Sequence, residues 1–160
     1  MEGSCALQGD QCAWVDFRDP RGPGSSLYKS VGGDVYVFDR VHEKLRRVTF
    51  DSPATPRPKH NAAVEGNLVA WLETSEVRTV PADINYVRMN RVVRLDLDKG
   101  TRCWFDRKQT NARLIYQRRF WGLVGDADHQ GGGRATHFDL DTTEIPWTCE
   151  PSPPPVEVAN

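Results

Sequence analysis

The sequence lacks any uninterrupted apolar run of about 18 residues, the length that a membrane-spanning helix needs. The opening stretch MEGSCALQGD also lacks the charged and apolar regions of a signal peptide. We therefore expect a soluble protein of unknown compartment, with no membrane insertion. A periplasmic or extracellular location stays open if Met1 is not the natural start.

An excess of charge of one sign is missing too, since 21 Lys and Arg against 22 Asp and Glu give a formal net charge of -1. Nucleic-acid binders usually carry a basic stripe. The pairs Arg46-Arg47 and Arg118-Arg119 are instead interpreted as solvated strand or turn positions. No nucleic-acid partner is predicted.

Cysteine is sparse and lacks metal-binding spacing. Cys5, Cys12, Cys103 and Cys149 form no CxxC motif and have no histidine-rich companion segment, which argues against a structural zinc site. Buried free thiols are the default interpretation. A disulfide is the alternative, because an exported protein would meet an oxidising compartment.

Signatures of nucleophilic catalysis are also missing. There is no GxSxG motif and no Cys-His signature, and the four histidines are isolated from any nucleophile. The sequence predicts no enzyme activity and no cofactor.

One loop, GDADHQGGG at residues 125–133, is the weak candidate for a metal site. Asp126, Asp128 and His129 resemble the start of a calcium loop, and the glycines permit tight curvature. A distal bidentate Glu is missing, so a flexible Asp/Gly hairpin loop is the favoured interpretation.

What the sequence does contain is an internal repeat. From Ala62 onward, the stretch NAAVEGNLVAWLE aligns without a gap on CALQGDQCAWVD, so that Gly66 falls on Gly9 and Trp71 falls on Trp14, 57 residues earlier. The same offset carries DVYVFDR onto RVVRLDL and therefore Asp39 onto Asp96. A period of this length indicates a repeat architecture.

Each unit contains short strand-like runs separated by turn residues, which predicts four antiparallel strands per unit. A third, degenerate unit places Asp139 43 residues after Asp96. In unit two the apolar Tyr86–Met89 stretch either extends the third strand or packs against a neighbouring unit. The expected divisions are unit one at 1–50, a Pro-rich connector at 51–60, unit two at 61–107, unit three at 108–149 and a Pro-rich tail without a packed partner at 150–160.

In LVAWLE both strand faces are apolar, because Val69 and Trp71 lie on one side and Leu68, Ala70 and Leu72 on the other. Such a strand is expected to be buried on both sides, with Trp14 and Trp71 serving core packing. Asp39, Asp96 and Asp139 each follow a strand, where an Asp commonly accepts backbone hydrogen bonds in the next turn.

The pattern AVEGNLVAWLE followed by DVYVFD and LRRVTF resembles the TolB-like, WD-type β-propeller repeat family. Unit three departs from it, with Leu123 and Gly125 at the positions of Trp71 and Glu73. The resemblance implies an all-β fold of about three four-stranded blades and a binding platform without common chemistry. Closed propellers need about four to eight blades. The expectation is half of a dimeric ring or a segment of a longer propeller, with an open arc the least favoured.

These observations lead to a functional hypothesis of a non-catalytic scaffold that binds another protein or a second copy of itself. One alternative is an accessory propeller segment of a larger hydrolase of the prolyl-oligopeptidase type. Another is a propeller that binds glycans or cations through the unit-three loop.

Overall fold

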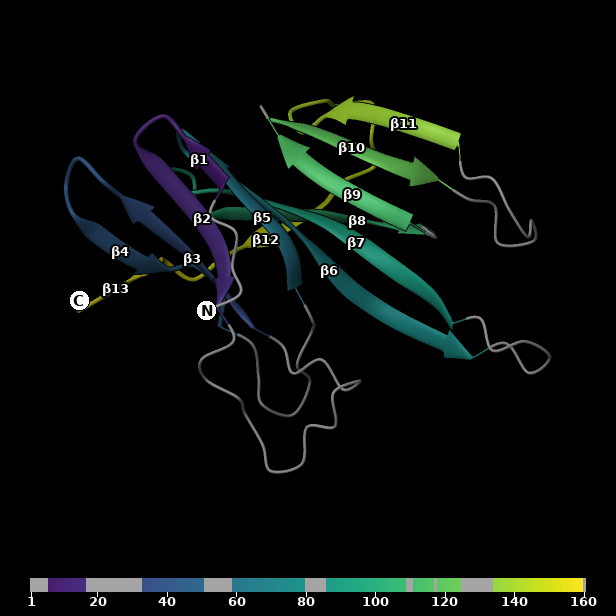
Figure 1. The fold of residues 1–160 in the computed structure, drawn as a ribbon, viewed down its shortest axis with the longest axis horizontal. Helices are drawn as coiled ribbons and strands as arrows, with labels where there is room; N and C mark the ends of the chain where they lie inside the picture. Colours follow the sequence, from purple (N-terminus) through teal and green to yellow (C-terminus); the bar gives the residue numbers. More distant parts are fainter. Residues whose placement is uncertain are drawn as a thin grey trace.

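A computed structural model describes residues 6–16, 33–50, 59–79, 86–108, 111–116, 118–124 and 134–159. Within these ranges the chain forms thirteen β-strands and no helix (Figure 1). Every described strand pair is antiparallel. The all-β, antiparallel fold expected from short runs separated by turn residues is thus confirmed.

The strands form three sheets. Sheet one has the order β1 (Ala6–Gln8), β2 (Gln11–Asp16), β3 (Asp34–Asp39), β4 (Lys44–Arg47) and β13 (Val156–Val158). Sheet two has the order β5 (Lys59–Glu65), β6 (Leu68–Thr79), β7 (Tyr86–Asp96), β8 (Thr101–Lys108) and β12 (Thr148–Pro151). Sheet three has the order β9 (Asn111–Tyr116), β10 (Arg119–Val124) and β11 (Arg134–Asp139).

Sheet two lies between the other two sheets. Its first strand, β5, contacts β1, β2 and β3 on one side and β9 on the other. Figure 1 shows β5 between the purple strands of sheet one and the green strands of sheet three. The first strands of successive units are therefore neighbours in space.

The turn between the first two strands is built alike in units one and two. Gly9 and Gly66 have φ angles of 61° and 59°, in the left-handed region that glycine enters without steric cost. Arg118, in the turn between β9 and β10, has a φ of 54°. A residue with a side chain is uncommon in this region, which makes the turn of unit three distinct.

One backbone hydrogen bond also repeats with the 57-residue offset. The Arg40 amide donates to the Asp10 carbonyl at 2.8 Å, and the Leu97 amide donates to the Asn67 carbonyl at 2.8 Å. In each unit, the bond joins the turn that follows the third strand (β3 or β7) to the turn between the first two strands. The sequence repeat is thus also a repeat of backbone geometry.

The larger core lies between sheets one and two. In β2 and β3, Ala13 pairs with Val37 and Val15 pairs with Val35, which places these small side chains on one face. The core consists of Ala13, Val15, Val35, Val37 and Val48 from unit one, and Ala62, Val64, Val69, Trp71, Val93 and Leu95 from unit two. Trp71 is 0% exposed and is the largest of these buried side chains.

A second core lies on the opposite face of sheet two. It consists of Ala63, Leu68, Ala70, Leu72, Val92 and Leu140, with Phe105 and Trp147 packed against it. The rings of Phe105 and Trp147 meet edge to face, with centroids 4.9 Å apart. The described part of β6 therefore buries apolar side chains on both faces, as its sequence predicted.

The long connection of unit two extends its strands. Tyr86 pairs with Thr79, so β6 and β7 continue as a hairpin arm well beyond the core. Of the alternatives for the Tyr86–Met89 stretch, strand extension is correct. At the other end of the unit, β5 begins at Lys59, two residues inside the expected connector.

The expectation of a C-terminal tail without a packed partner is wrong. Strand β12 pairs with β8, where Pro151 lies opposite Thr101, and β13 pairs with β4, where Val156 lies opposite Arg47. Both are edge strands, where a proline is tolerated because one side of the strand needs no ladder donors. The other three prolines of the tail, at 153–155, lie between β12 and β13.

The prediction for the fourth strand of unit three is also wrong. The segment around Cys149, predicted to close unit three, instead forms β12 at the outer edge of sheet two. Within the described residues sheet three has three strands. After β11 the chain thus returns along the outer edges of sheets two and one, in yellow in Figure 1.

The default interpretation of the cysteines as free thiols is wrong for the described ones. Cys103 and Cys149 are directly opposite in the β8–β12 ladder and form a disulfide with an S–S distance of 2.10 Å. Cys12 is disulfide-bonded as well. Cys5 lies outside the described residues. The Cys103–Cys149 bond joins strands 46 residues apart in sequence.

Two tryptophans at the same repeat position give a matched test of this packing. Trp71→Ala should lower the free energy of unfolding by about 3–5 kcal/mol, because it opens a cavity between two sheets. Trp14→Ala should cost roughly half as much or less, because Trp14 is only partly buried. Urea unfolding followed by circular dichroism measures both. Equal losses would contradict the assignment of Trp71 to an inter-sheet core.

Candidate functional site

The aspartates that recur in the repeat lie at the ends of β3, β7 and β11, in three different sheets. The Asp39 Oδ1 atom accepts the backbone amides of Val41 at 3.0 Å and His42 at 3.1 Å. Asp96 Oδ1 accepts the amides of Asp98 at 3.1 Å and Lys99 at 3.0 Å. Both carboxylates are therefore occupied by their own turns.

Asp139 is used differently. Its Oδ1 atom accepts a hydrogen bond from Arg119 Nε at 2.7 Å, across the β10–β11 pair. This contact holds the pKa of Asp139 below its usual value. The side-chain hydrogen bond from His42 does the same for the pKa of Asp39, with help from the His42 amide. The amide of Lys99 is the main cause of the lowered pKa of Asp96.

Glu73, at the repeat position of Asp16, belongs to a buried charge cluster. Its carboxylate is 1% exposed and accepts two hydrogen bonds from Arg102 Nη2, at 3.1 and 2.9 Å. Trp71 Nε1 donates to the same carboxylate at 3.4 Å. Lys59, 0% exposed, lies opposite Glu73 in the β5–β6 ladder. Removing one partner of a buried ion pair lowers the free energy of unfolding, because the other charge stays buried without compensation. We therefore expect this cluster to stabilise sheet two.

The face of sheet one that points away from sheet two is aromatic. Trp14 stacks on Tyr36 with ring centroids 6.0 Å apart, and both are partly buried. Phe38 and Leu45 lie in register on the same face and are partly buried too. We call these four residues the aromatic face.

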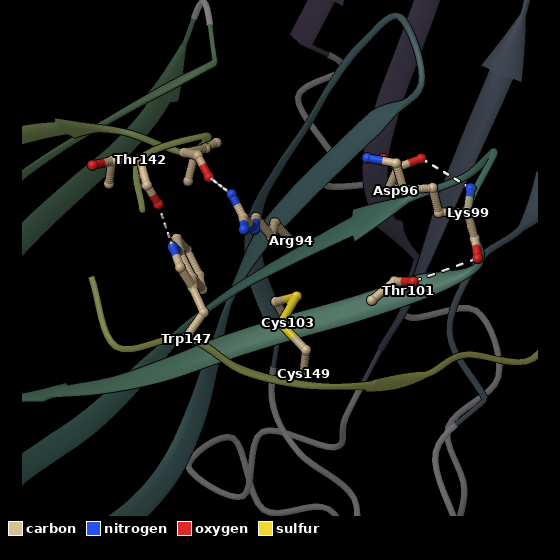
Figure 2. Close-up of a disulfide and its surroundings, with 9 residues drawn as sticks. Arg94, Asp96, Lys99, Thr101, Cys103, Thr142, Trp147 and Cys149 are labelled. Carbon is tan, nitrogen blue, oxygen red and sulfur yellow. Dashed lines mark hydrogen bonds and ion pairs between the residues drawn. A yellow bond between two sulfur atoms is a disulfide. The ribbon is translucent and has the colours of Figure 1, made fainter. Parts of the chain in front are cut away.

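A polar cleft of about 370 Å³ opens where sheet two meets the β9–β10 turn. It is lined by Leu68, Arg94, Asp96, Lys99, Thr101, Cys103, Arg118 and Asp141. Figure 2 shows its sheet-two side, with Arg94, Asp96 and Lys99 above the disulfide that joins Cys103 to Cys149. We call this feature the arginine cleft.

Two ion pairs border the arginine cleft. Arg118 makes a forked contact with Asp141, in which Nε donates to Oδ2 and Nη2 donates to Oδ1, both at 2.9 Å. Lys99 Nζ lies 3.3 Å from Asp96 Oδ2. A forked arginine–carboxylate contact is both stronger and more directional than a single bond. Arg118 and Asp141 therefore hold the β9–β10 turn beside the segment after β11.

Arg94, on β7, lines the same cleft. Its guanidinium lies over the Trp147 ring, 4.3 Å from the centroid, and Nη1 donates to the Leu140 carbonyl. Burial lowers the pKa of Arg94, although the charges of Asp141 and Asp96 oppose this shift. Trp147 is held in turn, because its Nε1 donates to the Thr142 carbonyl at 2.9 Å (Figure 2).

Sequence reasoning did not find the arginine cleft. It interpreted Arg118 as a solvated strand or turn position and assigned no role to Arg94, because neither residue belongs to a recognisable motif. The weak metal candidates Asp126, Asp128 and His129 lie outside the described residues. No group of three or more His, Cys, Asp or Glu residues suited to a metal ion occurs in the described part of the chain.

Comparison of this chain with protein-family models, with curated proteins and with solved structures finds no match. Among the residues that the structure describes, no helix has the length and apolarity to span a membrane.

The lowered pKa of Asp96 predicts a pH dependence of stability. A carboxylate whose folded pKa lies below its usual value of 3.8 stabilises the fold above that value and loses this contribution as pH falls through the folded pKa. The stability difference between wild type and Asp96→Asn should therefore shrink as pH falls from about 6 to about 2. Urea midpoints across this range measure the effect. A difference independent of pH would contradict the turn role of the carboxylate.

Proposed function

We propose that this chain is a non-catalytic interaction scaffold built from β-propeller-type repeats, and that its aromatic face binds a sheet of a second copy. The observation that carries the proposal is a difference in burial between equivalent positions. Trp14 is partly buried, whereas its repeat equivalent Trp71 is 0% exposed because sheet one covers it.

The equivalence extends to the two aromatic-face residues of β3. Tyr36 and Phe38 are partly buried, and the residues 57 positions later, Val93 and Leu95, are 0% and 1% exposed. In sheet two this face packs on another sheet of the same kind. The aromatic face therefore has the position, within its unit, at which a preceding sheet would pack.

The internal interface also indicates what the partner should present. The surface that covers Trp71 is made of small side chains, including Ala13, Val15, Val35 and Val37. Small residues let two sheets approach closely while a large ring fills the space between them. A sheet with the alternation of sheet one would provide this surface, and a second copy of the chain brings further sheets of the same repeat.

A propeller-type arrangement is supported by the order of the first strands, since β5 contacts both β1 and β9. Propellers set successive sheets around a central channel and close with about four to eight of them. Two copies of three sheets fall within this range. A non-catalytic role is supported by the recurring aspartates, each of which is held by groups of its own sheet.

The proposal predicts a dimer in solution. Light scattering after size exclusion should give twice the chain mass for the wild type, and Trp14→Glu should give the mass of one chain, because a buried unpaired charge opposes sheet packing. The control is Val41→Glu, in the turn beyond β3, where the side chain is 64% exposed. It should remain dimeric. A monomeric wild type, or a dimeric Trp14→Glu protein, would contradict the proposal.

A further inference from the structure

We propose that the arginine cleft is a binding site for a small organic carboxylate, held by Arg94 with support from Lys99. The inference does not depend on the proposed scaffold function, because the cleft lies within one chain. It rests on the balance of charges around the cleft, on the surroundings of Arg94 and on the size and lining of the space.

The cleft has one more positive side chain than negative ones. Arg94, Lys99 and Arg118 face two carboxylates, Asp96 and Asp141. Both oxygens of Asp141 are used by Arg118. On Asp96, Oδ1 accepts two turn amides and the Asn67 side-chain amide at 3.1 Å, and Oδ2 faces Lys99. Among these three positive side chains, Arg94 is therefore the one that is not paired with a carboxylate of the cleft.

Arg94 is placed to use this charge on a ligand. It makes no ion pair within the described part of the chain, and a single carbonyl, that of Leu140, accepts from its Nη1 atom. A guanidinium carries five N–H donors in a planar fork that matches a carboxylate. Because the guanidinium lies over the Trp147 ring and donates to the Leu140 carbonyl, part of its side-chain freedom is already lost before binding.

The guanidinium is also partly removed from water. Burial is the largest cause of the lowered pKa of Arg94. A charge that has lost part of its hydration interacts more strongly with an incoming anion than an exposed one does. This separates Arg94 from surface arginines such as Arg40, whose side chain is 72% exposed and already paired with Asp10.

The lining favours an anion with an apolar part. Leu68 and the disulfide-bonded Cys103 are both 6% exposed and form apolar wall beside the charged groups. A volume of about 370 Å³ is at the lower end of the range for small-molecule sites. These features fit a short aliphatic or aromatic carboxylate better than a nucleotide. Inorganic phosphate shares the anionic chemistry and must be compared directly.

The test is a titration of the full chain at low ionic strength with propionate, benzoate and inorganic phosphate, followed by NMR. Saturable shifts are expected at the Arg94 Nε–H and at the Lys99 amide with both carboxylates. Arg94→Gln should weaken carboxylate binding by about tenfold or more, since hydrogen bonds to a charged group are lost. Arg94→Lys should give an intermediate loss, because the charge stays while the fork is removed.

Arg40→Gln is the matched control and should bind as the wild type does. If Arg94→Gln fails to fold, Lys99→Gln replaces it, because the Lys99 side chain is 77% exposed and its loss leaves the core intact. Lys99→Gln should weaken carboxylate binding by several-fold and reduce the dependence of this binding on salt concentration. The absence of saturable shifts with the carboxylates would overturn the site. Tighter binding of phosphate than of either carboxylate would overturn the ligand class, and equal affinities of Arg94→Gln and Arg40→Gln would overturn the role of Arg94.

Discussion

The packing of sheet one against sheet two is the interaction on which the rest of the structure depends. Trp71 fills the space between the two sheets, and the small side chains of β2 and β3 let them approach. The opposite face of β6 is buried as well, by Leu140 and its neighbours. Sheet two is thus an internal layer, and its charged residues must be neutralised within it. Glu73 and Arg102 meet this requirement, because Arg102 Nη2 donates to both carboxylate oxygens of Glu73 at the edge of the core.

The C-terminal segment adds a second kind of constraint, at the outer edges of the sheets. Strands β12 and β13 cover the outer edges of β8 and β4, which would otherwise present unpaired backbone groups. The Cys103–Cys149 disulfide fixes the first of these pairings. It also places Trp147 where it can pack on Phe105 and support Arg94. The arginine cleft therefore depends on a contact between parts of the chain that are distant in sequence.

Local pattern was enough to predict much of the fold. The offset between Gly9 and Gly66 marks equivalent turns, and alternation in LVAWLE predicts burial on both strand faces, because side-chain direction follows directly from backbone period. Pairings between distant segments could not be predicted in this way. Strands of three or four residues such as β12 and β13 carry too little periodicity, and nothing in the spacing of Cys103 and Cys149 identifies them as partners. Arg94 was missed for the same reason, since its partners Leu140 and Trp147 come from another unit.

The aromatic face and the arginine cleft both follow from the same central claim, that units of one repeat pack face to face in sequence order. Nuclear Overhauser spectroscopy tests this claim most directly. The account predicts cross-peaks between the indole ring protons of Trp71 and the valine methyl groups of sheet one. It predicts no cross-peaks between these methyl groups and the ring protons of Trp147, because Trp147 lies on the far side of sheet two. A Trp71 indole without cross-peaks to any sheet-one methyl group would contradict it.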